Sequence, residues 1–240
     1  MPQPPRRRSA ARRLVSGVFE WAKSLSLALL LFLVVRSFLV EAFKIPSASM
    51  EGTLLVGDFL LVNKLVYGAE VPFTGARLPA VRQPHYRDVI VFQWPDDPTK
   101  NFVKRLVGLP GDTLSMENGV LVRNGAPQSE RYAVHSEPDI DPTGDDFHWQ
   151  GNFLVRRAVA RPVYRPSRNN WGPLVVPQRH YFVLGDNRDN SLDSRYWGFV
   201  PDTLVRGQPL FVYYSYSPDS ASTLDFITRI RWHRLGERVQ

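Results

Sequence analysis

Residues 45–54 read Ile-Pro-Ser-Ala-Ser-Met-Glu-Gly-Thr-Leu, and the rest of the chain is organised around this turn. It presents two serines, Ser47 and Ser49, after Pro46. The proline ring stiffens the turn because it fixes its own φ and restricts the residue before it. Taken alone, the stretch is typical of a serine-rich linker that leaves a membrane. Its meaning depends on an apolar run before it and on two motifs after it.

The composition describes a globular protein without cysteine chemistry. The 240 residues fit one domain with an anchor, or a domain with a sizeable insertion. Hydrophobic residues make up 43% of the chain, enough for a core, and 20 prolines suit strands and loops better than a helical bundle. The absence of cysteine excludes disulfides, cysteine nucleophiles and thiolate metal sites.

The apolar run at residues 18–40 is long enough to cross a bilayer as a helix. Lys23 and Arg36 lie near its ends, where long basic side chains reach the interface, and Trp21 has the place of an interfacial aromatic residue. We expect residues 1–17 to form a basic cytoplasmic tail, because positive charge stays on the cytoplasmic side. Everything after residue 40 then lies outside.

The N-terminal segment taken alone also fits a nucleic-acid arm or a cleavable signal peptide. The net charge of +7 includes an arginine cluster at residues 6–13, which is typical of an arm that binds nucleic acid. The apolar run that follows favours a membrane anchor instead. A basic region, an apolar core at residues 25–35 and small residues at Ser47 and Ser49 describe a signal peptide. Cleavage there would destroy the best candidate site, which favours an uncleaved anchor.

After the anchor, short β-branched and aromatic runs alternate with turn residues, as in a mainly β protein. We expect strands at residues 58–67, 88–94, 102–107, 181–184 and 210–216. The dipeptides Asn118-Gly119 and Asn124-Gly125 bracket a short apolar run. Because Asn-Gly is the strongest short-range hairpin signal, they predict a small meander.

Residues 128–179 are polar and proline-rich, with one convincing strand at 153–159, and predict an inserted lobe. Residues 226–235 predict a basic amphipathic helix or strand. The expected fold is therefore mainly β, with a small inserted lobe and one N-terminal transmembrane helix before it. Its antiparallel β-sheet catalytic domain is formed by residues 41–127 and 180–240.

A lysine on an expected apolar strand is the first candidate for chemistry. Side chains alternate along a strand, so Lys104 shares a face with Phe102 and Leu106. A serine hydroxyl needs a base before it attacks, and a lysine serves only when neutral. Because the ordinary lysine pKa is about 10.4, a base that works near pH 8 needs a pKa lowered by roughly 2 to 3, which apolar burial can supply. The alternative is an exposed strand lysine that blunts a sheet edge.

The loop at residues 185–195 is the second candidate, with three aspartates and two arginines among asparagine and serine. Asx turns and Asp–Arg pairs that brace a long loop explain this composition. The spacing of an EF-hand and a His-Glu-x-x-His motif are both missing, so we predict no metal site. A serine triad through His180 stays an alternative, although no Gly-x-Ser-x-Gly context supports it.

Three stretches together resemble the bacterial type I signal peptidases, the membrane-bound serine–lysine enzymes that cut signal peptides from exported proteins. They are the serine turn, Val-Lys-Arg-Leu-Val-Gly-Leu-Pro-Gly-Asp at residues 103–112, and Gly-Asp-Asn-Arg-Asp-Asn-Ser-Leu-Asp-Ser-Arg-Tyr-Trp-Gly at residues 185–198. The last two are highly specific. The sequence departs from the family where Gly52 replaces a frequent proline and where Arg87 replaces a common glycine.

The resemblance implies a role for each matching residue. Ser49 would be the nucleophile and Lys104 its general base, while the Ser47 hydroxyl and the Ser49 backbone N–H would form the oxyanion hole. Ser191 would orient the lysine amine. The charged residues that would brace the loop are Asp186, Arg188, Asp193 and Arg195. The strand after the nucleophile would bind the substrate by strand addition, with shallow pockets for small residues at the first and third positions before the cut.

The resemblance also implies a location and partners. We expect a single-pass protein of the bacterial cytoplasmic (inner) membrane, with its N-terminus cytoplasmic and its catalytic domain on the outer face. Its partners would be preproteins with signal peptides and the lipid bilayer, without cofactor, metal or nucleic acid.

Three rival functions share features with this chain. The SOS-repressor autopeptidases use a similar serine–lysine pair, but they would need an N-terminal DNA-binding domain and no span. A peptidase dedicated to one pilin-like or conjugation substrate is an open alternative. So is a catalytically silent, membrane-anchored β scaffold.

Overall fold

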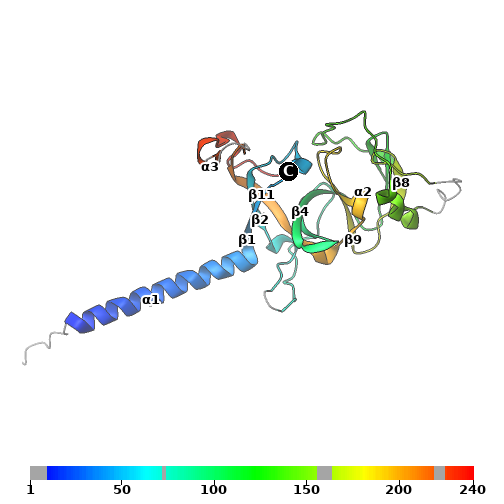
Figure 1. Cartoon of the computed structure of the whole chain (residues 1–240). Helices are drawn as coiled ribbons and strands as arrows, with labels where there is room; N and C mark the ends of the chain where they lie inside the picture. The colour runs from blue at the N-terminus through cyan, green and yellow to red at the C-terminus, as the bar shows by residue number, and fades with distance from the viewer. Residues whose placement is uncertain (1–9, 72–73, 156–163, 219–224) are drawn as a thin grey trace, which may run out of the picture.

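The computed structural model describes residues 10–71, 74–155, 164–218 and 225–240. Helix α1 (Ala10–Val34) continues into a π-helical turn at Val35–Leu39, and together they project as a single rod from a β body (Figure 1). The stretch Gly17–Leu39 has a mean hydropathy of 1.9 and is long and apolar enough to cross a membrane. Since its most apolar part is not buried by other described residues, the helix fits a membrane anchor.

The larger sheet has seven strands, and every pairing in it is antiparallel. In spatial order they are β1 (Val40–Lys44), β2 (Asp58–Asn63), β11 (Val205–Ser215), β3 (Val89–Trp94), β4 (Asp97–Gly108), β9 (His180–Leu184) and β10 (Val200–Pro201). Side chains alternate between the two faces of a strand, and this explains the burial pattern of β2. Asp58, Leu60 and Val62 are buried, and the residues between them are half-buried.

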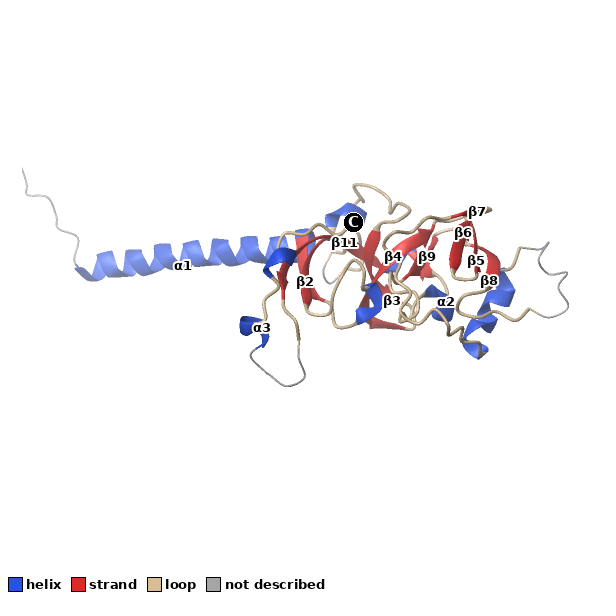
Figure 2. Ribbon diagram, turned by 90° about the horizontal axis from the view of Figure 1, so that it is seen from above, coloured by secondary structure: helices blue, strands red, loops and turns tan. Residues whose placement is uncertain are grey.

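The smaller sheet has four antiparallel strands and lies at the end of the body farthest from α1 (Figure 2). In spatial order they are β7 (Ala126–Pro127), β6 (Val120–Arg123), β5 (Thr113–Glu117) and β8 (Trp171–Val175). The predicted meander is present: Asn118 and Gly119 have φ values of 50° and 79°, and Asn124 and Gly125 have 51° and 80°. Two successive positive φ values are typical of the hairpin turn that Asn-Gly favours.

Strand β8 was not predicted, and it changes how the inserted lobe is organised. It belongs to residues 128–179, yet it pairs with β5, which precedes that segment. The boundary expected at residue 128 therefore separates strands that share one sheet.

Two predictions of local structure were wrong in part. The strand expected at 153–159 begins inside a 3₁₀ helix (Asp145–Phe153), where Phe153 packs on Trp149 and Phe199 with ring centroids 5.8 and 5.0 Å away. Residues 156–159 lie outside the described residues. The element expected at 226–235 is two short helices, α3 (Asp225–Thr228) and a 3₁₀ turn (Trp232–Arg234).

The strand expected at 58–67 ends early, at Asn63. The Asn63 side chain accepts hydrogen bonds from the backbone N–H groups of Leu65 (3.0 Å) and Val66 (3.3 Å). An asparagine that bonds the backbone in this way competes with the sheet ladder, so a 3₁₀ turn (Leu65–Tyr67) follows. The other short helices are α2 (Ser194–Trp197) and 3₁₀ turns at Ala48–Met50 and Asp202–Leu204.

Candidate active site

The serine turn is held by its apolar residues. Ile45, Met50 and Leu54 are each at most 3% exposed and pack in one core cluster with β2, β3 and β11. The backbone of Ile45 also bonds that of Asp58, with a distance of 2.8 Å from Ile45 N to Asp58 O. Because the apolar residues face inward, the polar residues between them are left near the surface. Ser49 is half-buried there.

The structure brings Ser49 and Lys104 together from distant parts of the chain. The Lys104 amine (Nζ) donates to Ser49 Oγ over 2.7 Å. Lys104 is 4% exposed, and its Nζ lies 5.3 Å from the centre of the Phe102 ring, as strand alternation predicted. A serine hydroxyl and a buried amine at this distance have the geometry of a nucleophile and its base.

Burial lowers the pKa of Lys104 to about 8, because the charged amine loses hydration inside the protein. The negative charges of Asp193 and Asp186 act in the opposite direction, and Arg195 adds to the lowering. Burial is the larger effect. A substantial fraction of the amine is therefore neutral at mildly alkaline pH and can accept a proton.

Ser47 lies next to the pair, with its Oγ 3.4 Å from Ser49 Oγ. It is exposed, so its hydroxyl can turn toward a group bound over Ser49. This position suits the oxyanion-hole role that the resemblance implies, which stays a prediction.

Ser191 is buried in the loop but forms no hydrogen bond to Lys104 in this structure. Its Oγ has no partner with hydrogen-bond geometry among the described residues. It lies close to Gly185, where an added Cβ would come within 2.1 Å of Ser191 Oγ and 2.4 Å of the Ser49 carbonyl oxygen. Gly185 therefore lets the loop approach the serine turn, and the orienting role of Ser191 stays a prediction.

The charged residues of the loop all form ion pairs. Arg195 binds Asp193 through two hydrogen bonds of 2.8 Å, and both side chains are fully buried. Burial alone would raise the pKa of Asp193, but the charge and hydrogen bonds of Arg195 hold it below its ordinary value. Arg188 binds Glu130 over 2.7 and 2.8 Å. Each charge near Lys104 thus has a counter-charge.

Arg105 and Thr53 join the loop to the other two parts of the site, and the sequence did not point to them. Arg105 binds Asp186 over 2.8 and 2.7 Å, and Thr53 Oγ1 donates to Asp186 over 2.6 Å. Arg105 follows Lys104 on β4, and Thr53 belongs to the serine turn. The available signal was an arginine next to a candidate base, on the strand face that it shares with Val103 and Val107.

A cleft of about 300 Å³ opens beside Ser49 and Lys104. Its walls are the serine turn with the preceding end of β1, residues 101–104 of β4, and two loop residues, Asn190 and Leu192. Strand β9 pairs with β4 only from Arg105 onward, so it does not cover this part of the β4 edge.

The expectation that substrate adds to the strand after the nucleophile is wrong. That strand, β2, lies between β1 and β11 and pairs with both. Since strand addition needs a free edge, β2 cannot accept another chain. The cleft against β4 is the accessible position instead.

Neither a metal centre nor a histidine triad is found in the part of the chain that the structure describes. No cluster of three or more His, Cys, Asp or Glu residues there could hold a metal ion. His180 Nδ1 lies 2.8 Å from the backbone carbonyl of Gln178, and no serine among the described residues forms a hydrogen bond with the His180 ring.

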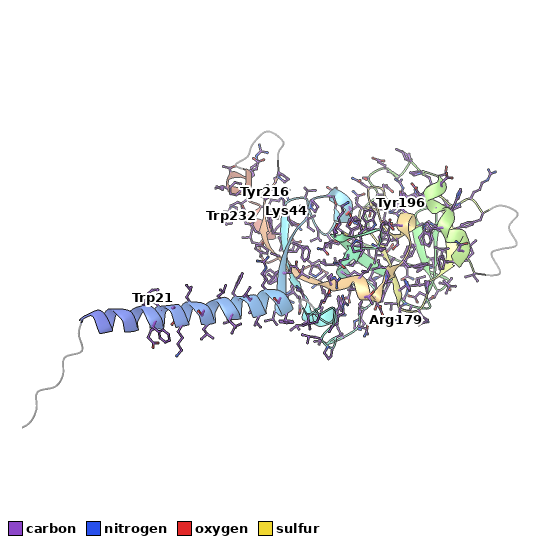
Figure 3. All side chains as sticks on the ribbon, turned by 60° about the horizontal axis from the view of Figure 1, so that its bottom comes forward. Trp21, Lys44, Arg179, Tyr196, Tyr216 and Trp232 are labelled. Carbon is purple, nitrogen blue, oxygen red and sulfur yellow. The ribbon has the colours of Figure 1, made fainter. Side chains whose placement is uncertain are left out.

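Exposed aromatic side chains gather at the α1 end of the body. Figure 3 shows Lys44 and Tyr216 close together near Trp232, and the Lys44 amine donates to the Tyr216 hydroxyl over 2.9 Å. Trp232 is 72% exposed, and Phe226 and Ile227 are also exposed. Aromatic and basic residues in this combination suit a membrane–water interface.

Known proteins are similar to this sequence over most of its length. The family described as signal peptidase, peptidase S26, matches residues 18–214. The signal peptidase I of Pseudomonas aeruginosa is 39% identical over 226 residues, covering 88% of this chain and 78% of its own. That of Aquifex aeolicus is 34% identical over 250 residues, covering 89% and 93%. A solved signal peptidase I from Enterococcus faecalis is 30% identical, covers 54% of this chain and 98% of its own, and has a TM-score of 0.36.

Proposed function

The chain belongs to the signal peptidase family, peptidase S26, and from this premise we propose that it is a membrane-bound endopeptidase that cleaves signal peptides from exported preproteins after small residues. One observation carries the proposal. Ser49 Oγ lies 2.7 Å from the buried Lys104 amine, beside a cleft that is open to solvent.

The reaction follows from this pair. Neutral Lys104 accepts the Ser49 hydroxyl proton while Oγ attacks the carbonyl carbon of the scissile bond. The tetrahedral oxyanion is stabilised by the Ser49 backbone N–H and the Ser47 hydroxyl. Lys104 then gives its proton to the leaving nitrogen, the C–N bond breaks, and an ester forms on Ser49. Water, activated by Lys104, hydrolyses the ester and restores the free serine.

The cleft favours an extended peptide with small side chains near the cut. The peptide lies between the serine turn and residues 101–104 of β4, where it can bond the uncovered strand edge. Phe43, Ile45 and Phe102 line the cleft, and we expect these bulky side chains to limit the room for large substrate residues near the cut.

The anchor has a mechanistic purpose in this proposal. Helix α1 holds the cleft near the bilayer surface, where the apolar segment of a signal peptide also lies. Tethering both molecules to one surface raises their effective concentration without new contacts. The basic N-terminal residues support a cytoplasmic N-terminus by the positive-inside rule, with the β body on the outer face of the cytoplasmic membrane.

The test is cleavage of a panel of preproteins by the full chain in detergent, with Ser49→Ala as the matched variant. We expect the wild type to cut after a small residue and Ser49→Ala to be inactive. A serine-directed acylating agent should label the wild type at Ser49. Equal cutting by both proteins would show that Ser49 is not the nucleophile, and no cutting with no labelling would favour a silent scaffold. Cutting of a single pilin-like substrate would favour a dedicated peptidase.

A further inference from the structure

Residues 129–137, here called the strap, leave the small sheet and cross the loop at residues 185–195. The strap begins just after β7, in the segment that the sequence assigned to an inserted lobe. It contains no regular helix or strand, yet it contacts all three parts of the site: the loop, the lysine strand and the serine turn.

The strap holds the loop mainly through its backbone. Val134 N donates to the Asp186 carbonyl and the Val134 carbonyl accepts from Arg188 N, both over 2.8 Å. Further along, Ser136 Oγ donates to the Asn187 side chain over 3.0 Å. The same loop reaches the nucleophile, because Asn187 N donates to the Ser49 carbonyl over 3.2 Å. Displacement of the strap would therefore change the contact of the loop with Ser49.

Tyr132 connects the strap to the lysine strand. Its ring centre lies 3.8 Å from the guanidinium carbon of Arg105, the neighbour of Lys104. The Tyr132 hydroxyl donates to Glu130 over 2.7 Å, and Glu130 in turn holds Arg188 of the loop by two hydrogen bonds. A single tyrosine thus bridges the arginine that pairs with Asp186 and the carboxylate that pairs with Arg188.

The strap also packs against the serine turn at Gly52. Gly52 has a φ of +109°, and an added Cβ would lie 2.7 Å from the Tyr132 carbonyl oxygen and 2.9 Å from a Val134 methyl carbon. Only glycine fits both this φ and this close approach. Gly52 stands where the family frequently has proline, and here the glycine allows the backbone of the strap to approach closely.

We propose that Tyr132 and Glu130 are positioning residues for this reaction, and that the strap holds the serine turn, the lysine strand and the loop in their catalytic arrangement. The inference rests on the proposed function. Its physical basis is that Ser49 and Lys104 come from separate segments, and a misplacement of about 1 Å can cost about a hundredfold in rate. A segment that contacts all three parts at once restrains their relative positions.

The test compares Tyr132→Ala, Tyr132→Phe and Glu130→Gln with the wild-type full chain in detergent. Rates are expressed per active site, counted by labelling with the acylating agent, so that unfolded protein does not contribute. We expect Tyr132→Ala to lower kcat at least about tenfold with KM within about twofold, the pattern of lost transition-state positioning. Tyr132→Phe keeps the ring on Arg105 and should restore most of kcat. Glu130→Gln should fall in between.

Tyr86 provides a matched control. Its ring centre lies 4.3 Å from the Arg123 guanidinium carbon, its hydroxyl donates to Gln128 over 2.9 Å, and it packs against the core of the small sheet. Tyr86 belongs neither to the strap nor to the three parts of the site, and Tyr86→Ala removes the same kind of contacts, so kcat per active site should stay within about twofold of the wild type.

The possible results separate the two proposals. An unchanged kcat in Tyr132→Ala, or an equal loss in Tyr86→Ala, would overturn the role of the strap while leaving the peptidase in place. If Tyr132→Ala does not fold, a wild-type kcat in Glu130→Gln overturns it in the same way. A wild type that neither cuts nor is labelled would overturn the proposed function, and this inference with it.

Discussion

Replacing Lys104 by methionine should abolish activity and stabilise the protein. Methionine has a similar length and no charge, so it fits the same space beside Phe102. In the wild type, folding leaves Lys104 only 4% exposed, and burial lowers the pKa of its amine from 10.5 to about 8. When the pKa of a group differs between the folded and the unfolded chain, that group raises or lowers the free energy of unfolding.

The magnitude follows from that difference. Between pH 8 and 10.5 the unfolded chain holds the proton and the folded chain does not, so the free energy of unfolding of the wild type rises with pH in this window. Below pH 8 the full cost is present, about 3 kcal/mol at about 1.4 kcal/mol for each pKa unit. Methionine removes this cost but loses the hydrogen bond to Ser49, worth about 1 kcal/mol. A net gain of about 2 kcal/mol is expected at pH 7.

The assay is unfolding by urea in detergent, followed by tryptophan fluorescence, for both proteins between pH 7 and 9.5. All other groups titrate in both proteins, so their contributions to the difference in the free energy of unfolding cancel. The stability advantage of Lys104→Met over the wild type should therefore shrink by about 2 kcal/mol over this range. Lys100→Met is the control, because Lys100 lies on the same strand with a side chain 60% exposed. It should stay within about 0.5 kcal/mol of the wild type at every pH. A Lys104→Met variant that is less stable at pH 7, with a gap independent of pH, would refute the argument that burial sets this pKa.

Three further predictions concern the reaction itself. The neutral fraction of Lys104 is about 1% at pH 6 and one half at pH 8, so kcat/KM for a preprotein should rise about fiftyfold between them; a flat profile would exclude this base. Ser47→Ala should lower kcat about 10² to 10³-fold with an unchanged thermal unfolding midpoint, and wild-type turnover in this variant would remove Ser47 from the oxyanion hole. Gly185→Ala places a Cβ against Ser191 and the Ser49 carbonyl, so activity and unfolding temperature should both fall; an unaffected variant would mean that the loop yields without disturbing the site.

The parts of this protein that the sequence predicted depend on neighbours along the chain. The apolar helix follows from composition, and the meander follows from Asn-Gly turns whose positive φ values need no tertiary help. The face of Lys104 follows from strand alternation, which placed it with Phe102. The family follows from two motifs that each lie within one short stretch.

The errors concern strand neighbours, which sequence periodicity does not encode. Strand β2 was expected to offer a free edge, but β1 and β11 cover it, and β11 comes from near the other end of the chain. Strand β8 was missed because a short run that contains Gly172 and Pro173 lacks the usual strand signal, although pairing with β5 stabilises it. The strand expected at 153–159 starts in a 3₁₀ helix because Phe153 packs in an aromatic cluster.

The order of residues alone defines the groups that are available for chemistry. They are a serine on a turn, a lysine on an apolar strand, a charged loop and an anchor. The folded structure adds that Ser49 and Lys104 lie 2.7 Å apart, that burial lowers the pKa of the amine to about 8, and that the Tyr132 ring lies against Arg105, the neighbour of Lys104. The physical reason is that local conformation depends on adjacent residues. Burial and distance between side chains depend on several segments that meet only when the whole chain has folded.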